Sequence, residues 1–179
     1  MNLPIRWYGD PVLRRKAEEV DPSDGRLDGL IRDMIETMHE GDGIGLAAPQ
    51  VGRSERLIVI DGSAFDGDEP RAFLNPRILE SSKGRVLYEE GCLSLPDLRA
   101  DVERPEAVRV RYRTESGEEV EEEAEGLYAR VLQHEIDHLD GVLFVDRLGA
   151  ARRALLAKRL REIQRKTEMR VLEEPPDGR

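Results

Sequence analysis

An amphipathic pattern runs through residues 27–38. Its apolar residues recur at intervals of three and four positions, which places them on one face of an α-helix. They are Leu27, Leu30, Ile31, Met34, Ile35 and Met38. Gly41 and Gly43 follow, and glycine commonly ends helices. The pattern therefore predicts a helix that ends near these glycines and continues into a loop.

The middle of the chain carries patterns of extended structure. Residues 57–60 form a short, wholly apolar run, which is typical of a buried strand. Residues 72–79 predict an extended segment that is broken by Pro76. Residues 108–113 alternate between apolar side chains and arginines, so this strand shows one face to the core and one to water. A turn at 114–117 predicts a hairpin whose returning, glutamate-rich strand lies opposite those arginines.

A second helix is predicted over residues 125–140, with Gly141 as its left-handed cap. Four of its side chains fall along one stripe, and we expect this stripe to face the interior of the protein. These residues are Leu127, Val131, His134 and His138.

A third helix is predicted over residues 149–169. Its apolar side is formed by Leu156, Leu160 and Ile163. The chain is long enough for one substantial core. We therefore expect an α+β fold, a single domain of mixed, largely antiparallel small sheets packed around the central helix 125–140, with a C-terminal helix. The predicted parts are a core over residues 1–148, a basic C-terminal helix of the same domain over 149–170 and a disordered tail over 171–179.

Charge is unevenly distributed along the chain. The net charge of −10 opposes nonspecific binding of nucleic acid by the whole molecule, and we expect no specific DNA partner. Residues 115–125 hold seven glutamates, whereas residues 150–170 hold eight arginines and lysines and only two glutamates. This basic segment is either a solvated helix face or a surface for phosphate contacts.

The sequence lacks the signals of export. No apolar run approaches the roughly 18 residues of a membrane span. The first residues carry neither the apolar core of a signal peptide nor an Arg/Ser-rich transit segment. The only cysteine cannot form an internal disulfide. We expect a cytoplasmic protein with no membrane partner.

The strongest chemical signal lies in residues 133–138. His134 and His138 share a helix face because they are four positions apart, so both can bind one divalent metal ion. Glu135 lies beside them, where it can act as a base. In the alternative interpretation, both histidines are ordinary polar groups of a half-buried helix. Catalytic metal sites usually have three protein ligands, so the metal hypothesis requires a third.

Three residues are candidates for that ligand. One class of metalloprotease takes its third ligand from a histidine at the position that Phe144 occupies here, so that class is excluded. Glu162 or Glu168 would give a metallopeptidase. Cys92 can supply a thiolate, which is a strong ligand for such metals, although a lone cysteine is often an inert core residue. We favour Cys92, His134 and His138 as the metal ligands, and a metallopeptidase that uses Glu162 is the alternative. A noncatalytic metal-binding or ribosome-binding module is a third class, which Glu135 argues against.

Residues 43–52 form a third segment, rich in glycine and alanine. Such residues let the backbone come close to a ligand, and the carboxamide of Gln50 can donate a hydrogen bond to an oxyanion. The segment lacks the ending of a phosphate-binding loop, so nucleotide binding is not indicated. Taken alone, it also fits an ordinary glycine-rich turn.

Together, and in this order, these segments resemble the peptide deformylase family, in its compact bacterial form. The matching motifs are Gly43-x-Gly45-x-Ala47-Ala48-x-Gln50, Glu90-Gly91-Cys92-Leu93-Ser94 and Gln133-His134-Glu135-x-Asp137-His138. The resemblance spans about residues 4–148. It implies a hydrolase that removes the formyl group from the N-terminal methionine of newly synthesised polypeptides and releases formate.

The expected chemistry follows from the metal ligands. A metal held by one thiolate and two neutral imidazoles lowers the pKa of a bound water towards neutrality, and this water would attack the formyl carbon. Glu135 would take the water proton and deliver it to the leaving amine. The side chain of Gln50 and the backbone N–H of Leu93 would donate to the developing oxyanion. Ligand chemistry permits zinc, iron, cobalt or nickel, and the resemblance implies Fe²⁺ in the cell.

The resemblance also implies how the peptide binds. Its backbone would lie along Gly45 and Glu90–Gly91, in an extended conformation. The methionine pocket would be lined by Ile44, Tyr88, Leu127, Val131 and His134. Arg130 departs from the family pattern, which more often has an apolar residue there, and we expect its side chain to reach outward at the pocket rim. Nascent chains emerge from the ribosome, so the basic C-terminal helix is a candidate for ribosome contact.

Overall fold

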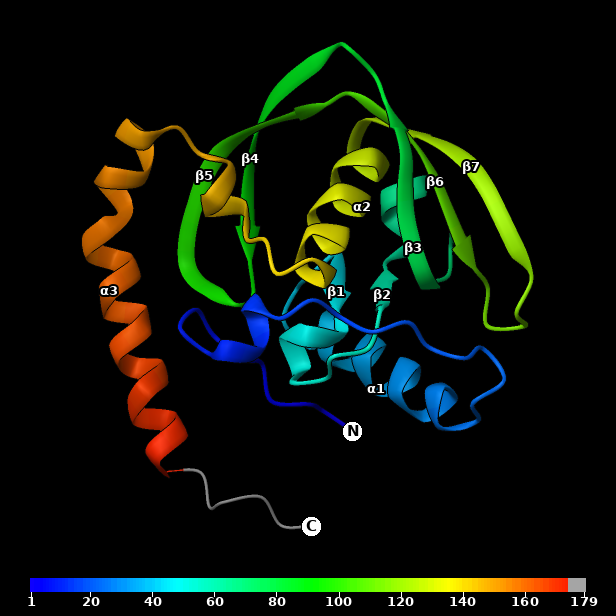
Figure 1. Cartoon of the computed structure of the whole chain (residues 1–179), viewed down its shortest axis with the longest axis horizontal. Coiled ribbons are helices and arrows are strands. Elements are labelled where there is room, and N and C mark those ends of the chain that lie inside the picture. Colours follow the sequence, from blue (N-terminus) through cyan, green and yellow to red (C-terminus); the bar gives the residue numbers. More distant parts are fainter. Residues whose placement is uncertain (174–179) are drawn as a thin grey trace.

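The central element of the fold is the helix α2 (Gly126–Leu139), which lies between two antiparallel sheets (Figure 1). The computed structural model describes residues 1–173. The expected α+β fold, a single domain with antiparallel sheets and a C-terminal helix, is confirmed. Gly141 has a φ of 73° just beyond the end of α2, which is the left-handed conformation predicted for it.

The larger sheet has five strands in the order β1-β2-β3-β6-β7, and every neighbouring pair is antiparallel. Its strands are β1 (Gly45–Ala47), β2 (Leu57–Ile60), β3 (Arg71–Ser81), β6 (Ala107–Arg113) and β7 (Glu119–Glu125). The four residues of β2 are all buried, as their apolar run predicts. In the β6–β7 hairpin, Arg111 lies opposite Glu121 and Arg113 opposite Glu119, so the expected facing of arginines and glutamates is confirmed.

Two predictions about this sheet are wrong. Pro76 does not break the extended segment, because β3 runs through it and the pairing with β6 shifts register between Leu74 and Arg77. Proline lacks the N–H that an uninterrupted ladder requires, so the strand bulges instead of ending. The segment after the first helix is also not simply a loop. It forms the short strand β1 and then the 3₁₀ turn η2 (Ala48–Val51).

The second sheet is a hairpin of two strands, β4 (Arg85–Cys92) and β5 (Leu95–Pro105), and the sequence did not predict it. Within residues 1–173, these strands pair only with each other. Most of β4 is exposed, so it has no apolar alternation to mark it as a strand. Its last residue is Cys92, and the hairpin therefore carries one of the candidate ligands towards α2.

Two further helices flank this core. The predicted first helix is α1 (Arg26–Glu40), and all of its buried residues except Thr37 belong to the apolar face of the pattern. The C-terminal helix α3 (Ala150–Glu173) lies outside the β4–β5 hairpin (Figure 1). Single 3₁₀ turns complete the structure at η1 (Pro11–Arg14), η3 (Gly62–Phe65) and η4 (Phe144–Arg147). Because α3 continues to Glu173, the prediction of a disordered tail is wrong for residues 171–173, and residues 174–179 lie outside the described part.

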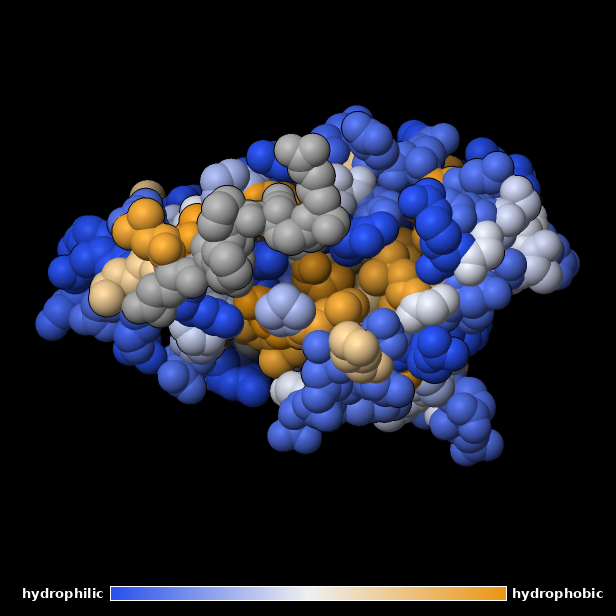
Figure 2. Space-filling view, turned by 90° about the horizontal axis from the view of Figure 1, so that it is seen from below, coloured by the Kyte–Doolittle hydropathy of each residue, from blue (hydrophilic) through white to orange (hydrophobic). Residues whose placement is uncertain are grey.

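The hairpin and α3 share a hydrophobic cluster. Leu160 and Ile163 of α3 are buried against Leu95, Leu98 and Val102 of β5, while Leu156 packs at the edge of the same cluster. Figure 2, a view from below, shows hydrophilic side chains over most of that face, with hydrophobic ones gathered towards its middle. In the described part of the chain, no helix is long and apolar enough to cross a membrane.

Candidate active site

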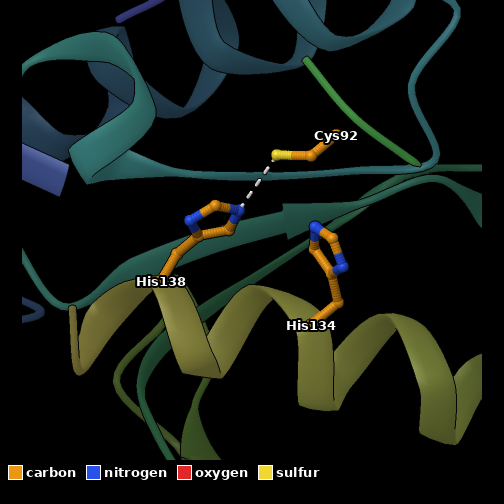
Figure 3. A group of neighbouring side chains, drawn as sticks. All are labelled: Cys92, His134 and His138. Carbon is orange, nitrogen blue, oxygen red and sulfur yellow. Dashed lines mark hydrogen bonds between the residues drawn. The ribbon is translucent and has the colours of Figure 1, made fainter. Parts of the chain in front are cut away.

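One side chain of β4 converges with two side chains of α2 that are distant from it in sequence. His134 and His138 project from α2 towards Cys92, at the end of β4 (Figure 3). One potential ligand atom from each residue lies within 4.8 Å of the other two, and within residues 1–173 this is the only such group of three. The Sγ atom of Cys92 is 3.3 Å from Nε2 of His138. The arrangement therefore brings together the three ligands favoured from the sequence.

The alternative ligands lie elsewhere. Glu162 accepts a hydrogen bond from Arg159 on α3, and Glu168 accepts one from Gln164 on the same helix. Neither carboxylate belongs to the group formed by Cys92 and the two histidines. The described geometry therefore gives no support to a metallopeptidase site built on Glu162.

His134 is oriented by the buried carboxylate of Glu90. Its Nδ1 atom lies 2.7 Å from Oε1 of Glu90. Burial alone would raise the pKa of Glu90, but hydrogen bonds from His134 and Arg104 outweigh it and hold that pKa far below its ordinary value. An ionised carboxylate can only accept, so Nδ1 of His134 carries the proton and donates it. Burial lowers the pKa of His134, but hydrogen bonds to Cys92 and Glu90 outweigh it and hold that pKa well above its ordinary value. The Nε2 atom, on the side of Cys92, would give up its proton on binding a metal.

His138 is suited to ligation in a different way. It is almost fully buried, and burial followed by the neighbouring charge of His134 lowers its pKa well below the ordinary value. The imidazole is therefore neutral, which is the form that binds metals. One thiolate with two imidazoles suits borderline divalent ions such as Fe²⁺, Zn²⁺, Co²⁺ and Ni²⁺, and binding of such an ion would displace the second proton of His134. The donor set thus fits a single ion of this class.

Glu135 lines the cleft beside these ligands. Burial raises the pKa of its carboxyl group to about 7, and its Oε2 atom has no hydrogen-bond partner in the described structure. Gly45 provides the room for this side chain, because a Cβ atom at Gly45 would lie 2.6 Å from Oε1 of Glu135. The glycine in the first motif is therefore explained by the close approach of Glu135 to β1.

Gln50 is held next to Cys92 by hydrogen bonds. Its Oε1 atom accepts a hydrogen bond from the backbone N–H of Ala47, which fixes the orientation of the amide. Its Nε2 atom donates to Oγ of Ser94 at 3.2 Å and to Sγ of Cys92 at 3.3 Å. Ser94 is fully buried and was not among the predicted site residues, although it lies in the second motif. Leu93, between Cys92 and Ser94, lines the cleft.

The cleft has a volume of about 700 Å³ and is lined mainly by residues of β1, β4, β5 and α2. All the residues predicted for the peptide site line it, namely Ile44, Gly45, Tyr88, Glu90, Gly91, Leu127, Val131 and His134. One detail differs from expectation. Leu127 is 42% exposed, so it lies at the mouth of the cleft and not in the interior. The carboxylate of Glu90 is buried behind His134, and only the backbone of Glu90 is in a position to meet a peptide.

The prediction that Arg130 reaches outward is wrong. Arg130 is only 8% exposed, and its Nη1 atom donates to Glu90 Oε2 at 2.7 Å. Glu90 also accepts two hydrogen bonds from Arg104, which in turn binds Asp137. Two guanidinium groups and one imidazole thus share a single buried carboxylate. An unpaired arginine would turn to water, but this one has a buried anion within reach.

The fold and this site are those of a metal-dependent hydrolase. A family model described as polypeptide deformylase matches residues 2–154. The chain therefore belongs to the polypeptide deformylase family, whose metal-dependent members remove the N-formyl group from nascent peptides.

Individual relatives agree with this assignment. A peptide deformylase of Thermotoga neapolitana is 52% identical over 159 residues, which cover 89% of this chain and 94% of that protein. The crystal structure of peptide deformylase from Thermus thermophilus superposes with a TM-score of 0.85 at 46% identity, and it covers 93% of this chain and 99% of that one. The peptide deformylase from Thermotoga maritima gives a TM-score of 0.79 at 49% identity, covering 83% and 99% of the two chains.

Proposed function

We propose that this chain hydrolyses the formamide bond of N-formyl-methionyl peptides in the cytoplasm, with Glu135 as the group that moves the proton. The observation that carries the proposal is the position of Glu135. Its carboxyl group is buried in the cleft, its Oε2 atom is unpaired, and its pKa of about 7 suits a group that both takes and returns a proton. Cys92, His134 and His138 lie beside Glu135, so the proton transfer would take place next to the proposed metal site.

Cys92, His134 and His138 would together hold one divalent ion, Fe²⁺ in the cell, with Zn²⁺, Ni²⁺ or Co²⁺ able to replace it. Such an ion, when bound, polarises a carbonyl oxygen and makes a neighbouring water more acidic. The buried Glu90 keeps His134 in the tautomer that ligation needs, and the burial of His138 keeps it neutral.

The reaction then requires one addition and one cleavage. Glu135 removes a proton from water as the water oxygen bonds to the formyl carbon. Glu135 then delivers this proton to the nitrogen of the peptide while the C–N bond breaks. The products are formate and a peptide with a free amino terminus. The atoms of one water molecule are divided between them, and no oxidant or reductant is needed.

Two donors would stabilise the charge that grows on the formyl oxygen. Gln50 is already held by Ala47 and Ser94, so its amide is preorganised near Cys92. The backbone N–H of Leu93 would be the second donor. Loss of one such donor typically lowers the rate by about 100- to 1,000-fold.

The substrate peptide would lie in the cleft, with its backbone along Gly45 and Gly91. Its methionine side chain would enter the pocket lined by Ile44, Tyr88, Leu127, Val131 and His134. The apolar side chains of Ile44, Leu127 and Val131 in this lining suit the unbranched thioether of methionine.

The direct test is formate release from an N-formyl-Met-Ala-Ser peptide under anaerobic conditions. Wild-type protein with a full complement of metal should release formate, and the Glu135→Gln protein should be at least about 100-fold slower with unchanged metal content. Cys92→Ser is the matched control, since it should lose the metal itself. An absence of formate release by fully metallated wild type would overturn the proposal.

A second proposal concerns location. The exposed basic residues of α3 would contact ribosomal RNA phosphates and hold the enzyme near emerging chains; they are Arg152, Lys158, Arg161, Arg165, Lys166 and Arg170. Exchange of Arg161, Arg165 and Lys166 for glutamate should abolish cosedimentation with ribosomes at low salt. The same exchange at Arg109, Arg111 and Arg113 of β6 is the control. Unchanged cosedimentation of the α3 variant would refute ribosome docking.

A further inference from the structure

A second cavity lies next to the proposed methionine pocket. Its volume is about 820 Å³, and it is formed where the beginning of α2 meets β4, the end of β5 and the start of β6. Three residues line both this cavity and the active-site cleft: Tyr88, Leu127 and Arg130. These three side chains therefore form the wall between the two spaces, and we call them the partition.

Arg130 is the buried part of the partition. Tyr88 and Leu127 are 54% and 42% exposed, whereas Arg130 is 8% exposed. The open parts of the wall are thus formed by the two apolar residues, and its base is formed by the arginine side chain. Removing Tyr88 or Leu127 would widen the mouths of the two spaces, but only removal of Arg130 would join them at depth.

Hydrogen bonds fix Arg130 across this gap. Its Nη1 atom donates to Glu90 Oε2 at 2.7 Å and to the carbonyl oxygen of Val102 at 2.9 Å. Its Nη2 atom donates to the carbonyl oxygen of Val86 at 2.7 Å. The side chain therefore ties α2 to both strands of the β4–β5 hairpin. With these contacts it is a rigid part of the wall and cannot swing aside as a surface arginine would.

We propose that Arg130 determines the length of the first side chain that the enzyme accepts, because it closes the methionine pocket at depth. The inference rests on the proposed function, in which the first residue of a formylated peptide enters this pocket. Without the arginine side chain, the pocket continues into the second cavity. N-formyl peptides with a first side chain longer than that of methionine then become good substrates.

The second cavity is suited to an unbranched hydrocarbon chain. Val86, Pro105, Ala107 and Leu127 supply apolar walls, while Glu106 and Glu125 are its only acidic lining residues and both are exposed. A longer alkyl side chain would bury additional methylene groups there. A carboxylate at the end of such a chain would meet the exposed glutamates and be rejected.

The variants distinguish the effect of removing the volume of the Arg130 side chain from the effect of removing its charge. Arg130→Ala removes the wall, and Arg130→Leu removes most of it while retaining an apolar side chain on the helix. Arg130→Met removes the charge but keeps a long side chain, so the wall remains. Arg104→Met is a further control, since Arg104 also binds Glu90 but lines neither cavity.

The test compares N-formyl tripeptides that begin with methionine or with 2-aminooctanoic acid, whose side chain is two carbons longer. In the Ala and Leu variants, the ratio of kcat/KM for the long over the methionine substrate should rise about tenfold, the effect of burying two further methylene groups. The Met variant and Arg104→Met should change this ratio less than about threefold, even where both activities fall. An unchanged ratio in the Ala and Leu variants, or an equal rise in the Met variant, would overturn the proposal.

Binding of unformylated peptides gives a readout that does not depend on turnover. Calorimetry with Met-Ala-Ser and its 2-aminooctanoyl counterpart should show the same roughly tenfold relative gain for the Ala and Leu variants. If wild type releases no formate, the proposed function fails, but this binding ratio still decides the role of Arg130. If wild type is active and neither ratio changes, Arg130 is a structural residue only.

Discussion

Two regions of this protein use the same kinds of charged residues in opposite ways. Around Glu90, the side chains of Arg104, Arg130 and Glu90 are 3%, 9% and 5% exposed and share one set of hydrogen bonds. On the β6–β7 hairpin, Arg111 pairs with Glu121 and Arg113 with Glu119, and these side chains are 40–53% exposed. The sequence shows arginine and glutamate in both places, and burial alone distinguishes a network that builds a site from one that covers a surface.

The contribution of these charged pairs to the stability of the fold also differs between the two regions. Exposed ion pairs contribute little, about 0–1 kcal/mol, because water screens them and long side chains lose entropy. A buried carboxylate is strongly unfavourable unless every partner is present, so removing one member of a buried pair is costly. Mutations in the two regions should therefore differ greatly in effect.

The largest effect should follow Glu90→Gln, because the neutral amide leaves Arg130 buried without its anion and leaves Arg104 with Asp137 alone. We expect a loss of roughly 3–5 kcal/mol in the free energy of unfolding, measured by urea denaturation. Metal content should also fall, since His134 loses the acceptor that sets its tautomer. Glu89→Gln is the matched control, because Glu89 is the exposed neighbour on β4 and should change stability by less than about 0.5 kcal/mol. Equal stabilities of the two variants would remove the distinction between the regions.

An intermediate effect is expected at Asp146, which binds Arg14 at a partly buried site. Burial raises the pKa of Asp146, but hydrogen bonds from Arg14 and the Leu143 N–H outweigh burial and leave that pKa below the ordinary 3.8. A lowered pKa in the folded state means that the stabilisation is present above about pH 4 and is lost as the pH falls further. Asp146→Asn should lower the free energy of unfolding by about 1–2 kcal/mol at pH 6.5.

The stability difference between wild type and Asp146→Asn should depend on pH, and this dependence tests the direction of the pKa shift of Asp146. The difference between wild type and Asp146→Asn should shrink when unfolding is repeated at pH 3, where the carboxylate of the wild type begins to be protonated. A difference that grows on acidification would contradict the sign derived from the pKa of Asp146.

The smallest effect should come from the surface pair Arg111 and Glu121. A double-mutant cycle with alanine at each position should give a coupling energy of at most about 0.5 kcal/mol, reduced further in 1 M salt. A coupling above about 1.5 kcal/mol would show that exposure on this hairpin does not weaken the pair.

The same contrast explains what the sequence could predict. The β6–β7 hairpin was predictable because alternation along residues 108–113 and the turn after them are local patterns. His134, Glu135 and His138 were predictable because one helix sets their spacing. The β4–β5 hairpin was not, since β4 is largely exposed and has no alternation. The orientation of Arg130 was missed for a similar reason, because its partner Glu90 is 40 positions away and no local pattern links them.

The separation of the ligands between β4 and α2 has a further consequence for the dynamics of the chain. Cys92 and His138 are 46 positions apart, and the hairpin that carries Cys92 pairs with no other strand in the described structure. An ion bound by both elements is a reversible cross-link that closes this loop, much as a disulfide would. Local opening of the hairpin and release of an ion held by the proposed ligands would then be one event, so the lifetime of the bound ion would be tied to how often the β4–β5 hairpin lifts from α2.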